Sequence, residues 1–114
     1  MGPGWCRPDG CDITSETCRV NGVYKVESSY QECSTTCFGQ ISCIGFAISG
    51  ETATFPNRCY VYGNISQQNA PSGWLEYPQQ YFEIHTTNHN STDVMCYKTI
   101  SVGNVNKQAT ILHK

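Results

Sequence analysis

The chain has 114 residues, the length of a single domain, and eight of them are cysteines. Only 14% of the residues are charged and the formal net charge is -2. The lysines and arginines are dispersed, which argues against a nucleic-acid partner because that function needs a basic stripe.

The even number of cysteines predicts a disulfide-stapled extracellular protein, since a domain this small buries only a modest core. A zinc protein is the alternative, but the sequence contains no C-x-x-C pair. No apolar run is long enough for insertion into a membrane.

Residues 1–17 are rich in Gly, Pro, Asp and Ser and lack periodicity, so we expect an N-terminal extension. Cys6 and Cys11 flank the turn-forming stretch Arg7–Gly10, and the simplest inference is a small local disulfide loop. The segment Met1–Gly4 lacks the apolar region of a signal peptide. For a secreted protein we therefore expect that a signal has been removed or replaced; the sequence leaves open whether the chain is an excised piece of a larger protein.

A strand or hairpin edge is predicted over Cys18–Val26, and a helix over about Tyr30–Phe38. Ser29 and Glu32 have the spacing of a capping box, in which the serine oxygen accepts a free amide and the glutamate reaches back. Gly39 is a natural stop because glycine adopts the left-handed conformation without penalty.

Two core strands follow the helix. Ile44, Phe46 and Ile48 alternate with smaller residues, which indicates a strand with one apolar face. After a polar loop, Arg58–Tyr62 predicts a second core strand that carries Cys59.

The C-terminal half is predicted to contain a loop over Gly63–Tyr77 and two strands, Tyr81–His85 and Val94–Ile100. The polar stretch Thr86–Asp93 separates these strands as a turn. Residues 101–114 are weakly patterned and are expected to form a peripheral tail.

The order of six cysteines resembles that of the PAN/apple family: Cys18, Cys33, Cys37, Cys43, Cys59 and Cys96. The helical C-x-x-x-C of Cys33 and Cys37, the C-x-G-F segment Cys43–Phe46 and the C-Y-V-Y segment Cys59–Tyr62 also resemble the family pattern. The resemblance covers about residues 18–98, and we assign the domain to residues 18–100. The family occurs in plasma proteins such as prekallikrein and plasminogen and in parasite adhesins.

The resemblance implies three disulfides: Cys33–Cys59, Cys37–Cys43 and Cys18–Cys96. Cys6 with Cys11 would remain as an extra pair. It also implies an α+β fold, in which one helix packs across an antiparallel sheet of about five strands. The N-terminal loop and the long Cys59–Cys96 interval depart from the family, so we transfer the scaffold and no ligand residue.

Catalysis and cofactors are not expected, because paired cysteines leave no thiolate. His85 and His89 lie four residues apart, but in a strand-to-turn stretch this spacing does not place them side by side for a metal. Surface histidines are the preferred interpretation. The carboxylates Asp9 and Asp12 are interpreted as solvated.

Two glycosylation acceptor patterns occur, at Asn64 in Asn64–Ser66 and at Asn90 in Asn90–Thr92. Both fall in expected surface loops of an extracellular chain, so both are candidate glycan sites.

The candidate ligand-binding residues are Trp74 and Tyr77, since exposed aromatic rings can stack on sugars or anchor a protein partner. Trp74 follows Gly73 and lies far from any cysteine, so we predict that it is exposed. Core packing is the alternative for this aromatic group, which includes Tyr81 and Phe82.

Together these features predict an extracellular, non-catalytic binding module for protein–protein adhesion or assembly. A lectin-like module for neutral glycans and a structural subunit of an extracellular filament or matrix, formed by self-assembly, are the alternatives.

Overall fold

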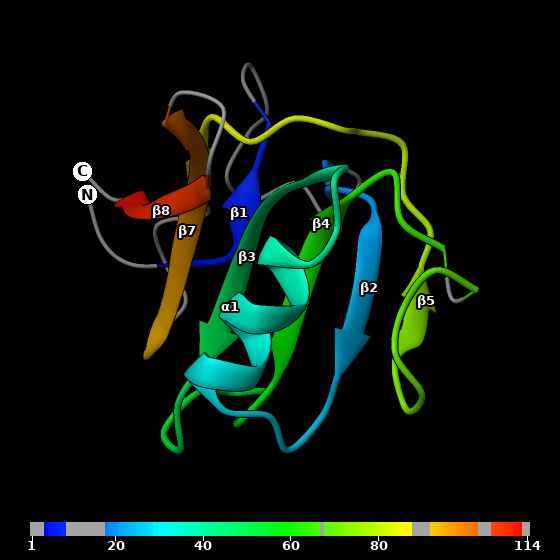
Figure 1. The fold of residues 1–114 in the computed structure, drawn as a ribbon. Coiled ribbons are helices and arrows are strands. Elements are labelled where there is room, and N and C mark those ends of the chain that lie inside the picture. The colour runs from blue at the N-terminus through cyan, green and yellow to red at the C-terminus, as the bar shows by residue number, and fades with distance from the viewer. Residues whose placement is uncertain (1–3, 9–17, 67, 88–91, 103–105, 113–114) are drawn as a thin grey trace.

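A computed structural model describes residues 4–8, 18–66, 68–87, 92–102 and 106–112. Within these residues one helix, α1 (Tyr30–Phe38), lies across one face of a six-stranded antiparallel sheet (Figure 1). The strand order is β5-β2-β4-β3-β7-β8, and α1 packs on the central strands β3 and β4. The α+β, disulfide-stapled fold expected from the sequence is confirmed, with six strands in this sheet instead of about five.

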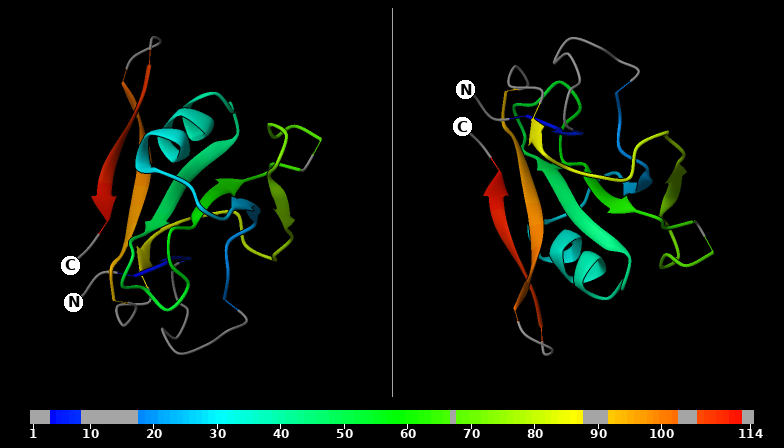
Figure 2. Two further views of the ribbon diagram at one scale, coloured as in Figure 1. Left: turned by 90° about the horizontal axis from the view of Figure 1, so that it is seen from below. Right: turned by 90° about the horizontal axis from the view of Figure 1, so that it is seen from above.

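The six strands are β2 (Gly22–Lys25), β3 (Cys43–Ser49), β4 (Cys59–Gly63), β5 (Leu75–Tyr77), β7 (Val94–Val102) and β8 (Asn106–Leu112). A separate antiparallel pair joins β1 (Cys6–Arg7) to β6 (Thr86–Thr87). Figure 2 shows this pair, with the chain that leads into β6, on the face of the sheet opposite α1. One face of the central sheet is therefore covered by α1, and the other is covered in part by this pair and its leading chain.

The N-terminus of α1 forms half of the predicted capping box. The Ser29 Oγ accepts a hydrogen bond from the Glu32 amide at 3.1 Å, which satisfies one of the helix's free donors. The Glu32 carboxylate does not reach back to the Ser29 amide. It accepts a hydrogen bond from Ser28 Oγ at 2.8 Å and pairs with Lys25 on β2, so the helix start is linked to the sheet.

The helix ends before Gly39, as predicted, but by a different geometry. Gly39 has φ -79° and ψ -6°, which lies in the right-handed region, and its amide donates to the Thr35 carbonyl. The left-handed conformation expected at this glycine is therefore not used.

Two expectations for the second half of the chain were wrong, and a third segment contains a strand that was not predicted. The stretch 63–77 ends in a strand, β5, which pairs with β2. Tyr81–His85 is not a strand: Tyr81 forms one isolated bridge with Val20, and regular pairing begins only at β6. Within the expected peripheral tail, residues 106–112 form β8, which pairs with β7 along its whole length at the edge of the sheet.

The segment before β6 packs closely on the sheet at Gly45 of β3. A Cβ atom at this position would lie 2.5 Å from the Ile84 Cδ1 atom and 2.5 Å from the Tyr97 carbonyl oxygen. Ile84 is 2% exposed, so the absence of a side chain at Gly45 is what allows it to be buried there.

Three disulfides join the described residues: Cys33–Cys59, Cys37–Cys43 and Cys6–Cys96. The first two are the pairs that the family resemblance implies, and both predictions are confirmed. Cys18 is also disulfide-bonded.

The expected pairs Cys18–Cys96 and Cys6–Cys11 are both wrong, because Cys96 is bonded to Cys6. Cys6 is fully buried and packs in a cluster with Ala47 of β3. The start of the chain is therefore part of the fold's core and not only an appendage to it. Cys11 lies outside the described residues.

Removing the Cys6–Cys96 bond should destabilise the protein more than removing Cys37–Cys43. The two bonds span 90 and 6 residues in sequence, so chain-entropy arguments give about 4.5 kcal/mol for the first and about 2 kcal/mol for the second. Urea unfolding of the C6A/C96A and C37A/C43A double variants measures both losses. An equal or larger loss for C37A/C43A would contradict this order.

Candidate functional site

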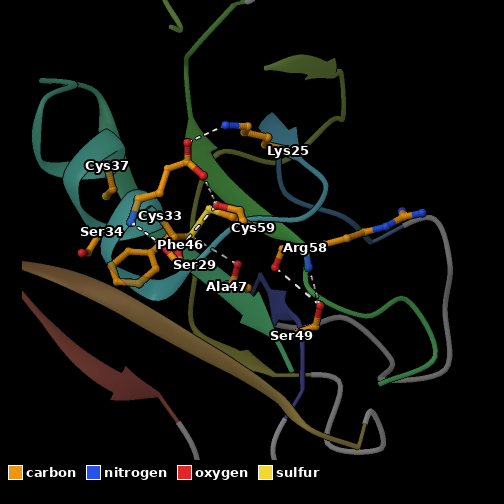
Figure 3. The surroundings of a disulfide bond; sticks show 12 residues. Lys25, Ser29, Cys33, Ser34, Cys37, Phe46, Ala47, Ser49, Arg58 and Cys59 are labelled. Carbon is orange, nitrogen blue, oxygen red and sulfur yellow. Dashed lines mark hydrogen bonds and ion pairs between the residues drawn. A yellow bond between two sulfur atoms is a disulfide. The ribbon is translucent and has the colours of Figure 1, made fainter. Parts of the chain in front are cut away.

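The register of the sheet separates its side chains into two chemically different faces. On the side of α1, a core cluster contains Val23 of β2, Phe46 of β3 and Val61 of β4. The Cys33–Cys59 disulfide joins α1 to β4 on this side (Figure 3). This face is closed by the helix and forms the main apolar core.

Trp74 belongs to this closed core. It is 2% exposed and lies in the same cluster as Val23 and Val61. The prediction that Trp74 is an exposed ligand-binding residue is therefore wrong. Its indole fills the space beside β2 and β4, and it is the largest of the fully buried side chains.

The opposite face carries four tyrosines from three adjacent strands, and we call this surface the tyrosine face. In the antiparallel register Tyr24 lies opposite Tyr60, and Gly22 lies opposite both Tyr62 and Tyr77. Residues directly opposite one another share a face of the sheet. Tyr24 and Tyr77 are partly exposed, whereas Tyr60 and Tyr62 are buried.

The rings of the tyrosine face pack on one another. Tyr60 stacks on Tyr24 with 5.3 Å between ring centroids and on Tyr62 with 6.1 Å. Tyr77 meets Tyr60 edge to face at 4.9 Å, as does Trp5 from the chain before β1. Such contacts hold the rings in fixed orientations, so the partly exposed members form a rigid surface.

All three arginines of the chain lie at this face. Arg58 Nη1 donates a hydrogen bond to the Tyr60 hydroxyl at 3.3 Å. Its guanidinium lies 4.8 Å from the Phe55 ring centroid and 6.0 Å from that of Tyr24. Arg19 Nη1 donates to the Tyr77 hydroxyl at 3.1 Å.

Arg58 is partly exposed, and no carboxylate in the described part of the chain forms an ion pair with it. Figure 3 shows its side chain extending away from the Cys33–Cys59 disulfide. The ion pairs that join described residues are Lys25–Glu32 and Glu83–His85, and neither involves this arginine. Its charged group is therefore held on aromatic rings and can form an ion pair with an acidic group of a binding partner.

Arg7 places a second cation beneath the same surface. Its side chain is 8% exposed, and its Nη1 donates to the Cys6 carbonyl at 2.9 Å. The Nε atom is buried and has no hydrogen-bond partner among the residues that the structure describes. Burial lowers the pKa of the Arg7 guanidinium from its ordinary value, an effect that neighbouring tyrosines such as Tyr62 partly oppose. An arginine remains charged at neutral pH, so this charge contributes a positive potential at the tyrosine face.

Burial has the opposite effect on the tyrosine hydroxyls. Loss of water raises the pKa of Tyr60 and raises that of Tyr62 well above its ordinary value. Both hydroxyls therefore remain protonated and neutral at physiological pH, and the arginines are the charged groups of this face.

Sequence reasoning identified Tyr77 but missed Tyr24, Arg7, Arg19 and Arg58 as members of one site. Part of the signal was present in the sequence. Cys59 lies on the helix side of β4, so strand alternation alone places Tyr60 on the other face. No local pattern indicates that the arginines converge there.

A separate cavity lies where β4 ends beside the start of β2, and we call it the edge cavity. Its volume is about 220 Å³. Its lining includes Asn21, Asn64, Ser66, Glu76, Pro78 and Phe82. The candidate glycan site Asn64 is thus an exposed residue on the cavity wall, whereas Asn90 lies outside the described residues.

The predicted surface position of His85 is confirmed: the residue is exposed, and its Nε2 lies 3.3 Å from a Glu83 carboxylate oxygen. His89 lies outside the described residues, as do Asp9 and Asp12. No group of three or more His, Cys, Asp or Glu side chains in the described part of the chain is arranged to hold a metal ion. Among the same residues, no helix is long and apolar enough to span a membrane.

Comparison of the chain with protein-family models, curated protein sequences and solved structures gave no match.

The buried Tyr62 hydroxyl should make the protein less stable at alkaline pH. Its pKa is raised in the folded state, so above the ordinary tyrosine pKa of about 10 the unfolded chain loses a proton that the folded protein keeps. Stability that is complete below that pH then falls by about 1.4 kcal/mol per pH unit for this group. Denaturant unfolding at a series of pH values from about 9 to 11 measures the slope.

The Tyr62→Phe variant should show a shallower alkaline loss than the wild type. Identical slopes for the wild type and Tyr62→Phe would contradict the burial of this hydroxyl.

Proposed function

We propose that the protein is an extracellular, non-catalytic binding module of PAN/apple type that recognises an acidic protein surface through the tyrosine face. The observation that carries this proposal is the rigid set of partly exposed rings, with Arg58 stacked at its edge and not neutralised by a described carboxylate. Tyrosine, tryptophan and arginine are the residues that most often dominate binding energy at protein interfaces.

The geometry favours binding because little conformational freedom is lost when a partner docks. Tyr24 and Tyr77 are already held by ring contacts with Tyr60 and with each other. Rigid aromatic anchors of this kind bind at a low cost in entropy. Arg58 supplies a planar donor that matches a carboxylate in two-point contact.

The extracellular location is supported by the cysteines. Every cysteine in the described part of the chain is in a disulfide. Disulfides of this density form and persist in oxidising compartments. The Cys33–Cys59 and Cys37–Cys43 pairs support the PAN/apple assignment, and the Cys6–Cys96 bond would be a departure from the family pattern.

The proposal predicts that an acidic aromatic polymer binds at the tyrosine face. A random copolymer of glutamate and tyrosine should shift the NMR signals of Tyr24, Tyr77, Trp5 and the Arg58 side chain. The effect should weaken as salt is added, because screening reduces attraction between exposed charges. A copolymer of lysine and tyrosine is the matched probe, with the same rings and the opposite charge, and should not bind.

Arg58→Gln should weaken binding of the acidic copolymer about tenfold, the loss typical of one interface anchor. Lys98→Gln is the control, since it removes an equal charge from β7, two strands away from β4 in the sheet. Equal binding of both copolymers, or equal losses in the two variants, would contradict the proposal. Shifts at this face with a neutral oligosaccharide instead would favour the lectin-like alternative.

A further inference from the structure

The acceptor pattern at Asn64 is held in a fixed conformation at the rim of the edge cavity. β4 ends at Gly63, whose amide donates to the Asn21 carbonyl at 2.8 Å. The next carbonyl, that of Asn64, accepts a hydrogen bond from Ser42 Oγ at 3.1 Å. Ile65 is 4% exposed and anchors the middle of the triplet, while the flanking Asn64 remains exposed.

Two polar side chains of the edge cavity, those of Asn21 and Ser66, are used within the fold. Asn21 Nδ2 donates to the Gly63 carbonyl and its Oδ1 accepts from the Gln79 amide, both at 2.9 Å. Ser66 Oγ donates to Asn69 Oδ1 at 2.8 Å. The side chains of Asn64 and Glu76, both exposed, form no hydrogen bond with another described residue, so apart from the attachment point itself Glu76 is the unused polar side chain of the lining.

A cavity with so few unused polar groups is poorly equipped to capture a free ligand. Its volume of about 220 Å³ is also below the roughly 300–1,000 Å³ of pockets that bind drug-sized molecules. A covalently attached group avoids this difficulty, because the tether holds it at a high effective concentration. Asn64 offers such an attachment point on the cavity wall itself.

Phe82 gives the cavity an apolar surface that the fold leaves open. Its side chain is 52% exposed, although it lines the cavity beside Pro78. The apolar face of a sugar ring packs well on an aromatic ring. Covering Phe82 would also remove exposed apolar area from water.

From these observations we infer that Asn64 carries an N-linked glycan whose first sugar occupies the edge cavity and stacks on Phe82. The natural modification rests on the extracellular location in the proposed function, since the acceptor pattern is glycosylated in the secretory pathway. The sugar's position in the cavity does not depend on that location or on the tyrosine face.

The test uses the full chain, directed into the secretory pathway of mammalian cells with an added signal peptide. An Asn90→Gln background leaves Asn64 as the acceptor under study. Intact-mass and peptide analysis should find glycan on Asn64. Thermal unfolding should show a Tm higher by roughly 5 °C than that of the same protein after enzymatic glycan removal.

In a Phe82→Ala variant, glycan removal should leave Tm nearly unchanged, because the sugar's stacking partner is gone. Phe55→Ala is the matched control, since Phe55 is 51% exposed and does not line the cavity. There the glycan-dependent shift in Tm should persist. In the wild type, NMR with isotope-labelled sugar should also show contacts between the first sugar and the Phe82 ring, which does not require the variants to fold.

Absence of glycan on Asn64 in secreted protein would overturn the inference, as would an undiminished glycan-dependent Tm shift in Phe82→Ala. Absence of sugar contacts with Phe82 would also overturn it. These results would leave the copolymer test at the tyrosine face unaffected, so failure of this inference and failure of the proposed function can be distinguished.

Discussion

The Cys33–Cys59 disulfide determines which face of the sheet is closed and which is left for other contacts. It bonds α1 to β4, a central strand, so the helix is fixed over the side of β4 that carries Cys59. Strand alternation then places Tyr60 and Tyr62 on the other side. Because the helix side is buried in the apolar core, the tyrosine face is the side of the sheet that can contact a binding partner.

The second layer on that side covers it only in part. The Cys6–Cys96 bond holds the chain of β1 over β7, and Ile84 packs against Gly45 of β3. Tyr24 and Tyr77 belong to β2 and β5, on the other side of β4 from β3, and they remain partly exposed. The same layer that buries Tyr62 and Arg7 therefore leaves the rings of Tyr24 and Tyr77 partly exposed, with Arg58 beside them. Burial keeps the phenols neutral while the guanidinium groups keep their charge, which is the basis of the proposed preference for acidic partners.

The sequence predicts the parts of the fold that depend on local signals. Ser29 and Gly39 mark the ends of α1, and alternation over Ile44–Ile48 marks the core of β3. The pairing of Cys6 with Cys96 could not be obtained in this way, because it depends on contacts between the two ends of the chain. A short turn beside Cys6 made the local Cys11 the simpler partner.

The candidate site was predictable to a smaller extent, and Trp74 shows why. It follows Ser72 and Gly73 in a loop-like sequence, which favours exposure, but its neighbours in space are Val23 and Val61 from strands far away in the chain. The convergence of three arginines on the tyrosine face has the same origin, since they come from β1, the chain before β2 and the residue before β4. Long-range packing brings these residues together, and no periodic pattern in the sequence indicates that they converge.

The most direct test of the two-faced arrangement is the light-induced nuclear polarisation of tyrosine and tryptophan by a flavin dye, which reports the accessibility of each ring in solution. Signals are expected from Tyr24, Tyr77 and Trp5, and no signal is expected from Tyr62 or Trp74. A strong Trp74 signal together with silent Tyr24 and Tyr77 would contradict this arrangement. The face under α1, and not the tyrosine face, would then be the accessible one.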